Sequence, residues 1–169
     1  MDIRIRGLDP APFHTLFEAS PQELAARRAV VRVADRMPGF PCRATLEDAV
    51  PGETVLLVNH THQAAETPFH SAHAVYFRLA AHAPYDAVNQ VPPALARRTL
   101  SLRAFDAEGW LLGFRLVPGT EMLDAARELL AVPRAAYLHA HYAGAGCYAA
   151  RVGRLGPRFG RRPPFVREE

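Results

Sequence analysis

The sequence predicts a single α+β domain over residues 1–153, with a mainly antiparallel sheet of about seven or eight strands and about three helices. The chain has 169 residues, of which 49% are hydrophobic, so it is long enough to bury one core. Strand-like apolar segments outnumber helical ones, and the helix signals occur early and late in the chain. Most segments between strands are short turns, which join antiparallel neighbours, whereas parallel pairing needs long crossovers.

The first part of the chain predicts a strand, two helices and a second strand. Residues 3–5 alternate between apolar and charged types, as a short strand does. Asp9-Pro10 is typical of a helix start and predicts a short helix over 9–17. Ser20-Pro21-Gln22-Glu23 is a capping box that opens a helix over 20–28. The β-branched segment 29–34 favours a strand.

A turn and a loop flank the strand predicted over residues 54–62. Met37-Pro38-Gly39-Phe40-Pro41 excludes regular structure. Residues 54–62 form the most apolar strand, and 63–71 form a polar loop. Residues 72–79 alternate, which places His73 on the apolar face of its strand.

The later elements follow from the same signals. They are a loop over 80–93, a short helix over 94–98, a hairpin of strands 99–106 and 110–117, a helix over 121–130 and a last hairpin over 135–153. Thr120 is the predicted N-cap of the 121–130 helix, and Pro133 ends it.

The charge is unevenly distributed along the chain. All 20 basic residues are arginines, and residues 154–169 hold five of them with two glutamates, which accounts for the whole formal net charge of +3. We expect this Gly/Pro/Arg tail to be disordered or to lie on a partner. Because the body is neutral, nucleic-acid binding is not expected. No signal sequence or membrane span is visible, so we expect a cytoplasmic protein whose cysteines stay reduced.

Two pairs of histidines are the first candidates for a site. His139 and His141 project from one face of a strand, while the other face is apolar. They line either a hydrogen-bonded sheet face or the floor of a pocket, where imidazole serves as ligand, acid or base. His60, His62 and Glu66 are similar to the first metal motif of cupins, although no second motif follows. We favour the alternative that this strand simply becomes polar as it leaves the core. If both pairs faced one cavity, they would suffice for a divalent metal.

Three further residues each have a structural and a functional interpretation, and a fourth has a functional one. Arg103 is either a surface ion-pair partner or a clamp for an anion. Asp106 accepts a local N–H in a turn or contacts a ligand. Cys147 lies within reach of the histidines but lacks a helix start, so an inert thiol is favoured over a nucleophile. Arg43, delivered by the Pro-Gly-Phe-Pro turn, is a second source of positive charge.

In this order these motifs resemble a bacterial family catalogued as domain of unknown function 1203. The resemblance covers Ile3 to about Gly153. It rests on Pro-Gly-Phe-Pro-Cys-Arg, His62-Gln63 with Pro68, Ser-Ala-His-Ala, Arg-Ala-Phe-Asp and His-Ala-His followed by Gly-Cys-Tyr-Ala-Ala-Arg. The matching polar positions are Cys42, Arg43, His62, His73, Arg103, Asp106, His139, His141, Cys147 and Arg151. His60 departs from the family pattern, where an aromatic residue is usual, and Tyr142 stands in place of asparagine. The family name implies no activity.

We therefore expect a polar pocket lined by His62, His73, His139 and His141, with Arg43 or Arg103 supplying charge. It would bind a small polar or anionic ligand, with catalysis and a divalent metal as open questions. The alternative is a non-enzymatic interaction or structural module, in which the histidines and arginines form a stabilising network. The expected partners are a small molecule and no membrane, and a homodimer is left open.

Overall fold

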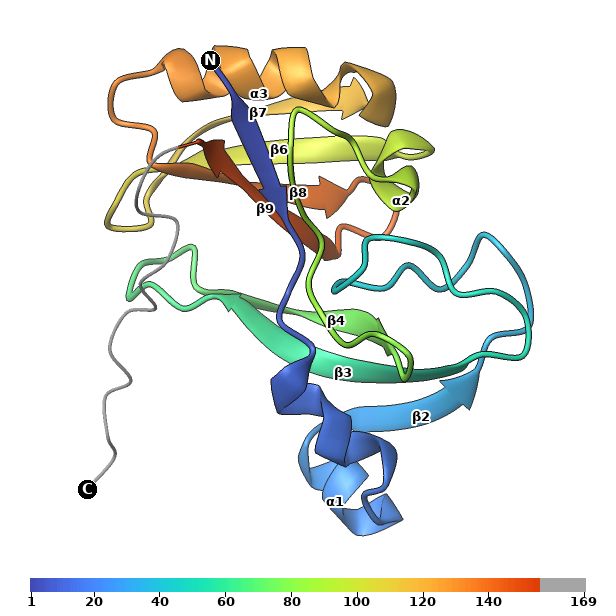
Figure 1. The fold of residues 1–169 in the computed structure, drawn as a ribbon. Helices are drawn as coiled ribbons and strands as arrows, with labels where there is room; N and C mark the ends of the chain where they lie inside the picture. The colour runs from blue at the N-terminus through green and yellow to red at the C-terminus, as the bar shows by residue number, and fades with distance from the viewer. Residues whose placement is uncertain (156–169) are drawn as a thin grey trace.

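Nine strands divide into two antiparallel sheets in the computed structural model, which describes residues 1–155. The larger sheet has the order β5-β1-β9-β8-β6-β7 and the smaller one the order β2-β3-β4. Figure 1 shows the larger sheet above the smaller one, with helix α3 on its outer side. The α+β class and the antiparallel pairing are confirmed. The strands form two sheets, whereas the sequence predicted one.

The bounds of the elements follow the sequence patterns closely. The larger sheet contains β1 (Ile3–Arg6), β5 (Asp86–Val88), β6 (Thr99–Phe105), β7 (Leu111–Pro118), β8 (Tyr137–Tyr142) and β9 (Tyr148–Arg154). The smaller sheet contains β2 (Ala29–Val33), β3 (Thr54–Gln63) and β4 (Ser71–Arg78). The helices are η1 (Ala11–Phe17) and η2 (Gly119–Glu121), both 3-10, with α1 (Pro21–Ala26), α2 (Pro93–Ala96) and α3 (Met122–Ala131). Strand β5 lies inside the segment predicted to be a loop.

The main core lies between the larger sheet and α3. Alternation along β8 points Leu138 and Ala140 into this core, where they are fully buried with Leu130 of α3. Each fully buried leucine contributes about 2 kcal/mol of hydrophobic stabilisation. The same alternation directs His139 and His141 toward the smaller sheet, so the core on one face of β8 fixes the position of the polar pair on the other.

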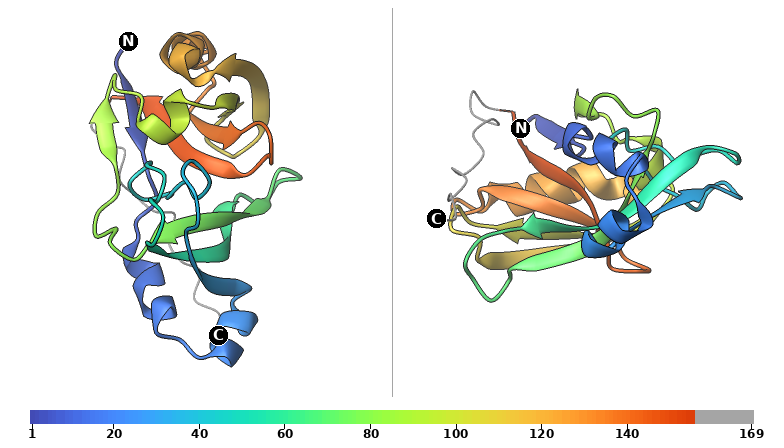
Figure 2. Two further views of the ribbon diagram at one scale, coloured as in Figure 1. Left: turned by 90° about the vertical axis from the view of Figure 1, so that its right-hand side faces the viewer. Right: turned by 90° about the horizontal axis from the view of Figure 1, so that it is seen from below.

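A second core joins the smaller sheet to the N-terminal segment. Phe13 of η1 stacks on Phe77 of β4, with ring centroids 4.1 Å apart. A register irregularity between Thr61 and Gln63 interrupts the pairing of β3 with β4. The left view in Figure 2 shows α3 and α1 at opposite ends of the molecule, with the sheets between them.

Of the two N-caps predicted for α1 and α3, one is correct and one is wrong. The capping box at α1 is confirmed, since Ser20 and Glu23 exchange the two expected hydrogen bonds. Thr120 does not cap α3, whose N-cap is Glu121 without a side-chain bond. The reason is that Thr120 lies inside the 3-10 turn η2, where its backbone is already helical, whereas an N-cap residue needs an extended backbone. The backbone N–H of Gly119 donates to the Arg98 carbonyl at 2.8 Å at the start of this turn.

The C-terminal boundary also shifts by one residue. Arg154, assigned to the tail from sequence, ends β9, and its guanidinium donates to the carbonyl oxygens of Ala135 and Leu130. Residues 156–169 lie outside the described part of the chain, and so does the prediction of a disordered tail. Among the described residues, no helix is long and apolar enough to cross a membrane.

Candidate functional site

Four histidines from three strands meet between the two sheets. They are His62 of β3, His73 of β4, and His139 and His141 of β8. His62 is the central member, because its Nε2 lies 2.6 Å from Nδ1 of His73 and its Nδ1 lies 3.4 Å from Nδ1 of His139. Its ring centroid is 5.2 Å from that of His141. The structure thus brings one member of the first histidine pair against both members of the second.

His60, the other member of the first pair, is not in this cluster. Its ring packs edge-on against Phe13, with centroids 5.6 Å apart. His60 pairs directly with His73 in the β3–β4 ladder, whereas His62 lies at the register irregularity between Thr61 and Gln63. The three-histidine group that could hold a metal contains His62, His139 and His141, without His60.

Tyr148 at the start of β9 covers the cluster. Its ring stacks on His62 at a centroid distance of 4.6 Å and meets His139 edge-on at 5.0 Å. Tyr137 lies beside His139 and exchanges hydrogen bonds with the side-chain amide of Gln63, which joins β8 to β3. These aromatic contacts fix the imidazole planes and bury His139 and His141 almost completely.

The turn between β8 and β9 orients His141. Gly146 adopts φ +75°, and its backbone carbonyl lies 3.0 Å from Nδ1 of His141. A carbonyl only accepts, so Nδ1 of His141 carries the hydrogen and Nε2 presents its lone pair. Nε2 is buried and has no hydrogen-bond partner in residues 1–155. The Gly-Ala-Gly turn therefore holds His141 so that the lone pair of its Nε2 is free to bind a metal ion.

Burial keeps the imidazoles neutral. It lowers the pKa of His62 to about 3, with further lowering from His141 and His73. Burial also lowers the pKa of His141 to about 4, against the opposite effect of the Gly146 carbonyl. The pKa of His139 is lowered well below its ordinary value, first by burial and then by His62 and Arg151. At neutral pH each ring therefore has one nitrogen lone pair available for coordination.

The spacing of these nitrogens suits a metal ion. The ligand atoms of His62, His139 and His141 all lie within 4.8 Å of one another. Two nitrogens bound to one tetrahedral zinc at about 2.0–2.1 Å are about 3.4 Å apart, and the Nδ1 atoms of His62 and His139 have that separation. His62 is the least buried of the three ligands, and His139 and His141 are buried almost completely.

Two cavities flank the cluster. The larger, of about 660 Å³, is lined by His62, His139, Tyr148 and Arg151, and also by Asp9. The smaller, of about 340 Å³, is bordered by His62, His141 and Arg103. Arg103 pairs directly with His139 in the β6–β8 ladder, which puts the two side chains on the same face of the sheet. The lining of the smaller cavity contains arginine but no carboxylate.

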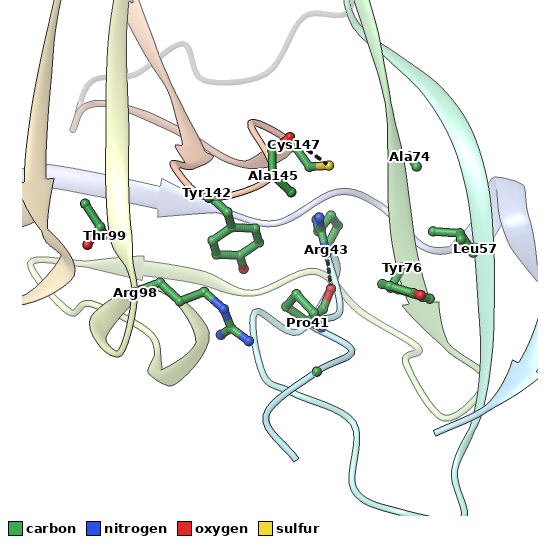
Figure 3. Close-up of a pocket in the computed structure, with 12 residues that line it drawn as sticks. Pro41, Arg43, Leu57, Ala74, Tyr76, Arg98, Thr99, Tyr142, Ala145 and Cys147 are labelled. Carbon is green, nitrogen blue, oxygen red and sulfur yellow. Dashed lines mark hydrogen bonds between the residues drawn. The ribbon is translucent and has the colours of Figure 1, made fainter. Parts of the chain in front are cut away.

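The remaining predicted residues lie elsewhere. Asp106 accepts a hydrogen bond from the Trp110 backbone N–H at 2.8 Å and pairs with Arg134 at 2.8 Å, as its turn interpretation requires. Arg43 and Cys147 line a third cavity, shown in Figure 3, which shares no lining residue with the other two. Cys42 is fully buried in the second core.

Sequence reasoning missed Tyr148 and the role of the Gly146 carbonyl. Tyr148 stands next to Cys147, and only the register irregularity between β8 and β9, which places Tyr148 opposite His141, makes it part of the site. The sequence signal for Tyr148 is its position directly after the Gly-Cys turn that follows the two histidines.

The comparison with protein families identifies one matching family. Residues 39–154 match the family described as "Protein of unknown function (DUF1203)". The chain belongs to this DUF1203 family. The match includes all four clustered histidines, together with Arg43, Arg103, Asp106 and Cys147. No curated protein and no solved structure matches the chain. The segment that matches the DUF1203 family therefore carries the histidine cluster.

Proposed function

We propose that this DUF1203 protein binds a divalent transition metal through His62, His139 and His141, and a small anionic ligand beside it. Imidazole nitrogens suit zinc, iron, copper and nickel. Three protein ligands leave a coordination position for water or a ligand, as in catalytic zinc sites. A metal held there would supply Lewis acidity to a ligand oxygen or to a bound water.

The observation that carries this proposal is the hydrogen bonding of the second ring nitrogens. Metal-binding histidines usually donate their other N–H to a nearby acceptor. His141 donates from Nδ1 to the Gly146 carbonyl, which leaves Nε2 for the metal. His62 has the same arrangement when its Nε2–H donates to Nδ1 of His73 at 2.6 Å, which leaves its Nδ1 for the metal.

The surrounding charge favours an anion. Three neutral imidazoles cancel none of the charge of a divalent ion, and Arg103 and Arg151 border the two cavities beside them. Burial lowers the pKa of Arg103, so its guanidinium would be stabilised by a negative neighbour. A carboxylate or another oxyanion bound at the open coordination position of the metal would supply this negative charge.

The second candidate function is a non-enzymatic module in which the histidines form a stabilising network. The 2.6 Å bond between His62 and His73 and the stacking of Tyr148 on His62 favour it, because both hold the sheets together without a metal. The unpartnered Nε2 of His141 counts against it, since a purely structural network satisfies its buried polar atoms.

Titration of chelator-treated protein with Co²⁺ tests the proposal. We expect visible absorption bands of tetrahedral cobalt at close to one equivalent, lost in His139→Gln and His141→Gln. His60→Gln is the matched control, because His60 lies on the same strand as His62 but outside the three-histidine group. Addition of acetate or thiocyanate to the cobalt form should then shift the bands.

The absence of cobalt bands, or bands that survive both variants, would contradict the metal centre. Circular dichroism spectra of the variants that match the parent protein exclude unfolding as the cause of a loss. Loss of folding in both variants without any metal binding by the parent would favour the structural network.

A further inference from the structure

The third cavity has the features of a separate ligand site. It has a volume of about 640 Å³, within the usual range for small-molecule sites. Residues from both sheets and from the turn between β8 and β9 line it. Figure 3 shows Arg43 in the middle of this lining, between Tyr142 of the larger sheet and Leu57 and Ala74 of the smaller one.

Arg43 is a buried cation with no carboxylate partner in residues 1–155. Its side chain is 3% exposed, and its guanidinium donates from Nε to the Tyr148 carbonyl at 2.8 Å and from Nη1 to the Pro41 carbonyl. These bonds position the group without neutralising it. Nη2 makes no hydrogen bond within the described residues and is left to face a ligand. Buried charges in proteins are normally paired, so an unpaired one that borders a cavity calls for an external anion.

Tyr142 contributes a second unsatisfied group. Its ring lies between two guanidinium groups, with its centroid 4.9 Å from Cζ of Arg43 and 5.1 Å from Cζ of Arg98. Its hydroxyl is buried and has no hydrogen-bond partner in residues 1–155. A ligand oxygen between Arg43 and Tyr142 would accept from both.

The charge balance around this ring identifies the sign of the ligand. Arg98 is paired with Asp48, with Nη2 and Oδ1 separated by 2.6 Å, and Arg97 approaches the same carboxylate at 3.6 Å. The Asp48 carboxylate therefore pairs with Arg97 and Arg98, while the positive charge of Arg43 has no carboxylate partner among residues 1–155. The three guanidinium groups and one carboxylate leave an excess of positive charge, so the cavity favours a negatively charged ligand.

The rest of the lining is mainly apolar. Pro41, Leu57, Ala74 and Ala145 surround the cation and offer surface for a hydrocarbon group. We infer that this cavity binds a small carboxylate with an apolar body, its carboxylate held by Arg43 and Tyr142. This site is distinct from the proposed metal centre, although Tyr148 touches both, through its carbonyl to Arg43 and its ring to His62.

Cys147 provides a direct reporter of occupancy. It lines the cavity and is partly exposed, whereas Cys42, the other cysteine, is fully buried. Iodoacetamide should therefore alkylate Cys147 first, and a bound carboxylate should slow that reaction. Benzoate and hexanoate are the probes, and benzamide and hexanamide are neutral controls of the same shape. Mass spectrometry of the native full-length chain gives the alkylation rate at Cys147.

Tyr142→Phe is the decisive variant, because it removes only a hydroxyl that has no partner. The ring keeps its contacts with both arginines, so the variant should fold and melt as the parent protein does. We expect the affinity for the carboxylates to fall about tenfold or more, since hydrogen bonds to charged groups are strong. Arg43→Gln should abolish binding, and Tyr85→Phe, whose hydroxyl donates to the Gln90 carbonyl outside the cavity, should have no effect.

Equal protection by carboxylates and amides would overturn the inference, and so would protection that is unchanged in Tyr142→Phe. No protection by either carboxylate would overturn it as well. Carboxylate binding that persists in His141→Gln separates this site from the metal centre, because that variant loses the proposed metal ligand and keeps Arg43 and Tyr142. Loss of carboxylate binding in a folded His141→Gln variant would show one shared site and contradict the assignment.

Discussion

Acidification should destabilise the metal-free protein in a pH range where carboxylates do not yet titrate. The folded state keeps His62, His139 and His141 neutral, whereas the unfolded chain protonates them near the ordinary pKa of 6.5. Because the unfolded state binds more protons, folding stability is complete above pH 6.5 and falls as the pH decreases toward the folded pKa values, about 4 for His141 and about 3 for His62.

The size of this loss follows from the pKa differences. Each histidine reduces the free energy of unfolding by about 1.4 kcal/mol per pH unit below 6.5. His141 alone accounts for about 3 kcal/mol between its ordinary pKa of 6.5 and its folded pKa of about 4. Three histidines together give a slope of up to about 4 kcal/mol per unit, which is large beside a typical total stability of about 5–15 kcal/mol.

Urea unfolding followed by circular dichroism between pH 7 and 5 measures this slope. His141→Gln is the control variant, because it removes one titrating ring, and it should reduce the slope by about 1.4 kcal/mol per pH unit. A free energy of unfolding that stays constant between pH 7 and 5 would refute the reasoning, since it would mean that the cluster is protonated or open to water in the folded protein.

Three further predictions concern single positions. Gly146→Ala places a Cβ at φ +75° and should cost about 1–2 kcal/mol in urea unfolding, and it should also weaken Co²⁺ binding because the acceptor of His141 shifts. Gly119→Ala brings a Cβ to 1.9 Å from the Leu95 carbonyl oxygen, so urea unfolding should show a loss of about 2 kcal/mol or more with the same Co²⁺ affinity per folded molecule. Asp106→Ala removes the acceptor of the Trp110 N–H and the partner of Arg134; it should lower the melting temperature and leave Co²⁺ affinity unchanged, and a loss of cobalt binding would instead place Asp106 in the site.

The local parts of this structure could be predicted from sequence. Alternation along β8 correctly placed His139 and His141 on one face and the apolar residues on the other, since strand side chains alternate wherever the strand lies. The capping box at Ser20 was also predictable, because its two hydrogen bonds involve residues three apart. The strand and hairpin bounds agreed for the same reason.

The non-local parts could not be predicted. Whether His60 or His62 meets the second histidine pair depends on the irregularity after Thr61 and on how the two sheets pack. The separation of Arg43 from the histidines depends on the course of the segment before β3, which no periodic pattern describes. Strand β5 pairs with β1 across a long sequence separation, and its three residues give too little pattern to detect.

The metal content of the purified protein tests the central claim most directly. Untagged protein prepared without chelator should contain zinc, iron, copper or nickel by elemental mass spectrometry, at close to one equivalent per chain. The His139→Gln/His141→Gln double variant, prepared in the same way, should contain none. A parent protein that holds no metal even after reconstitution, or a double variant that retains it, would contradict the three-histidine metal centre.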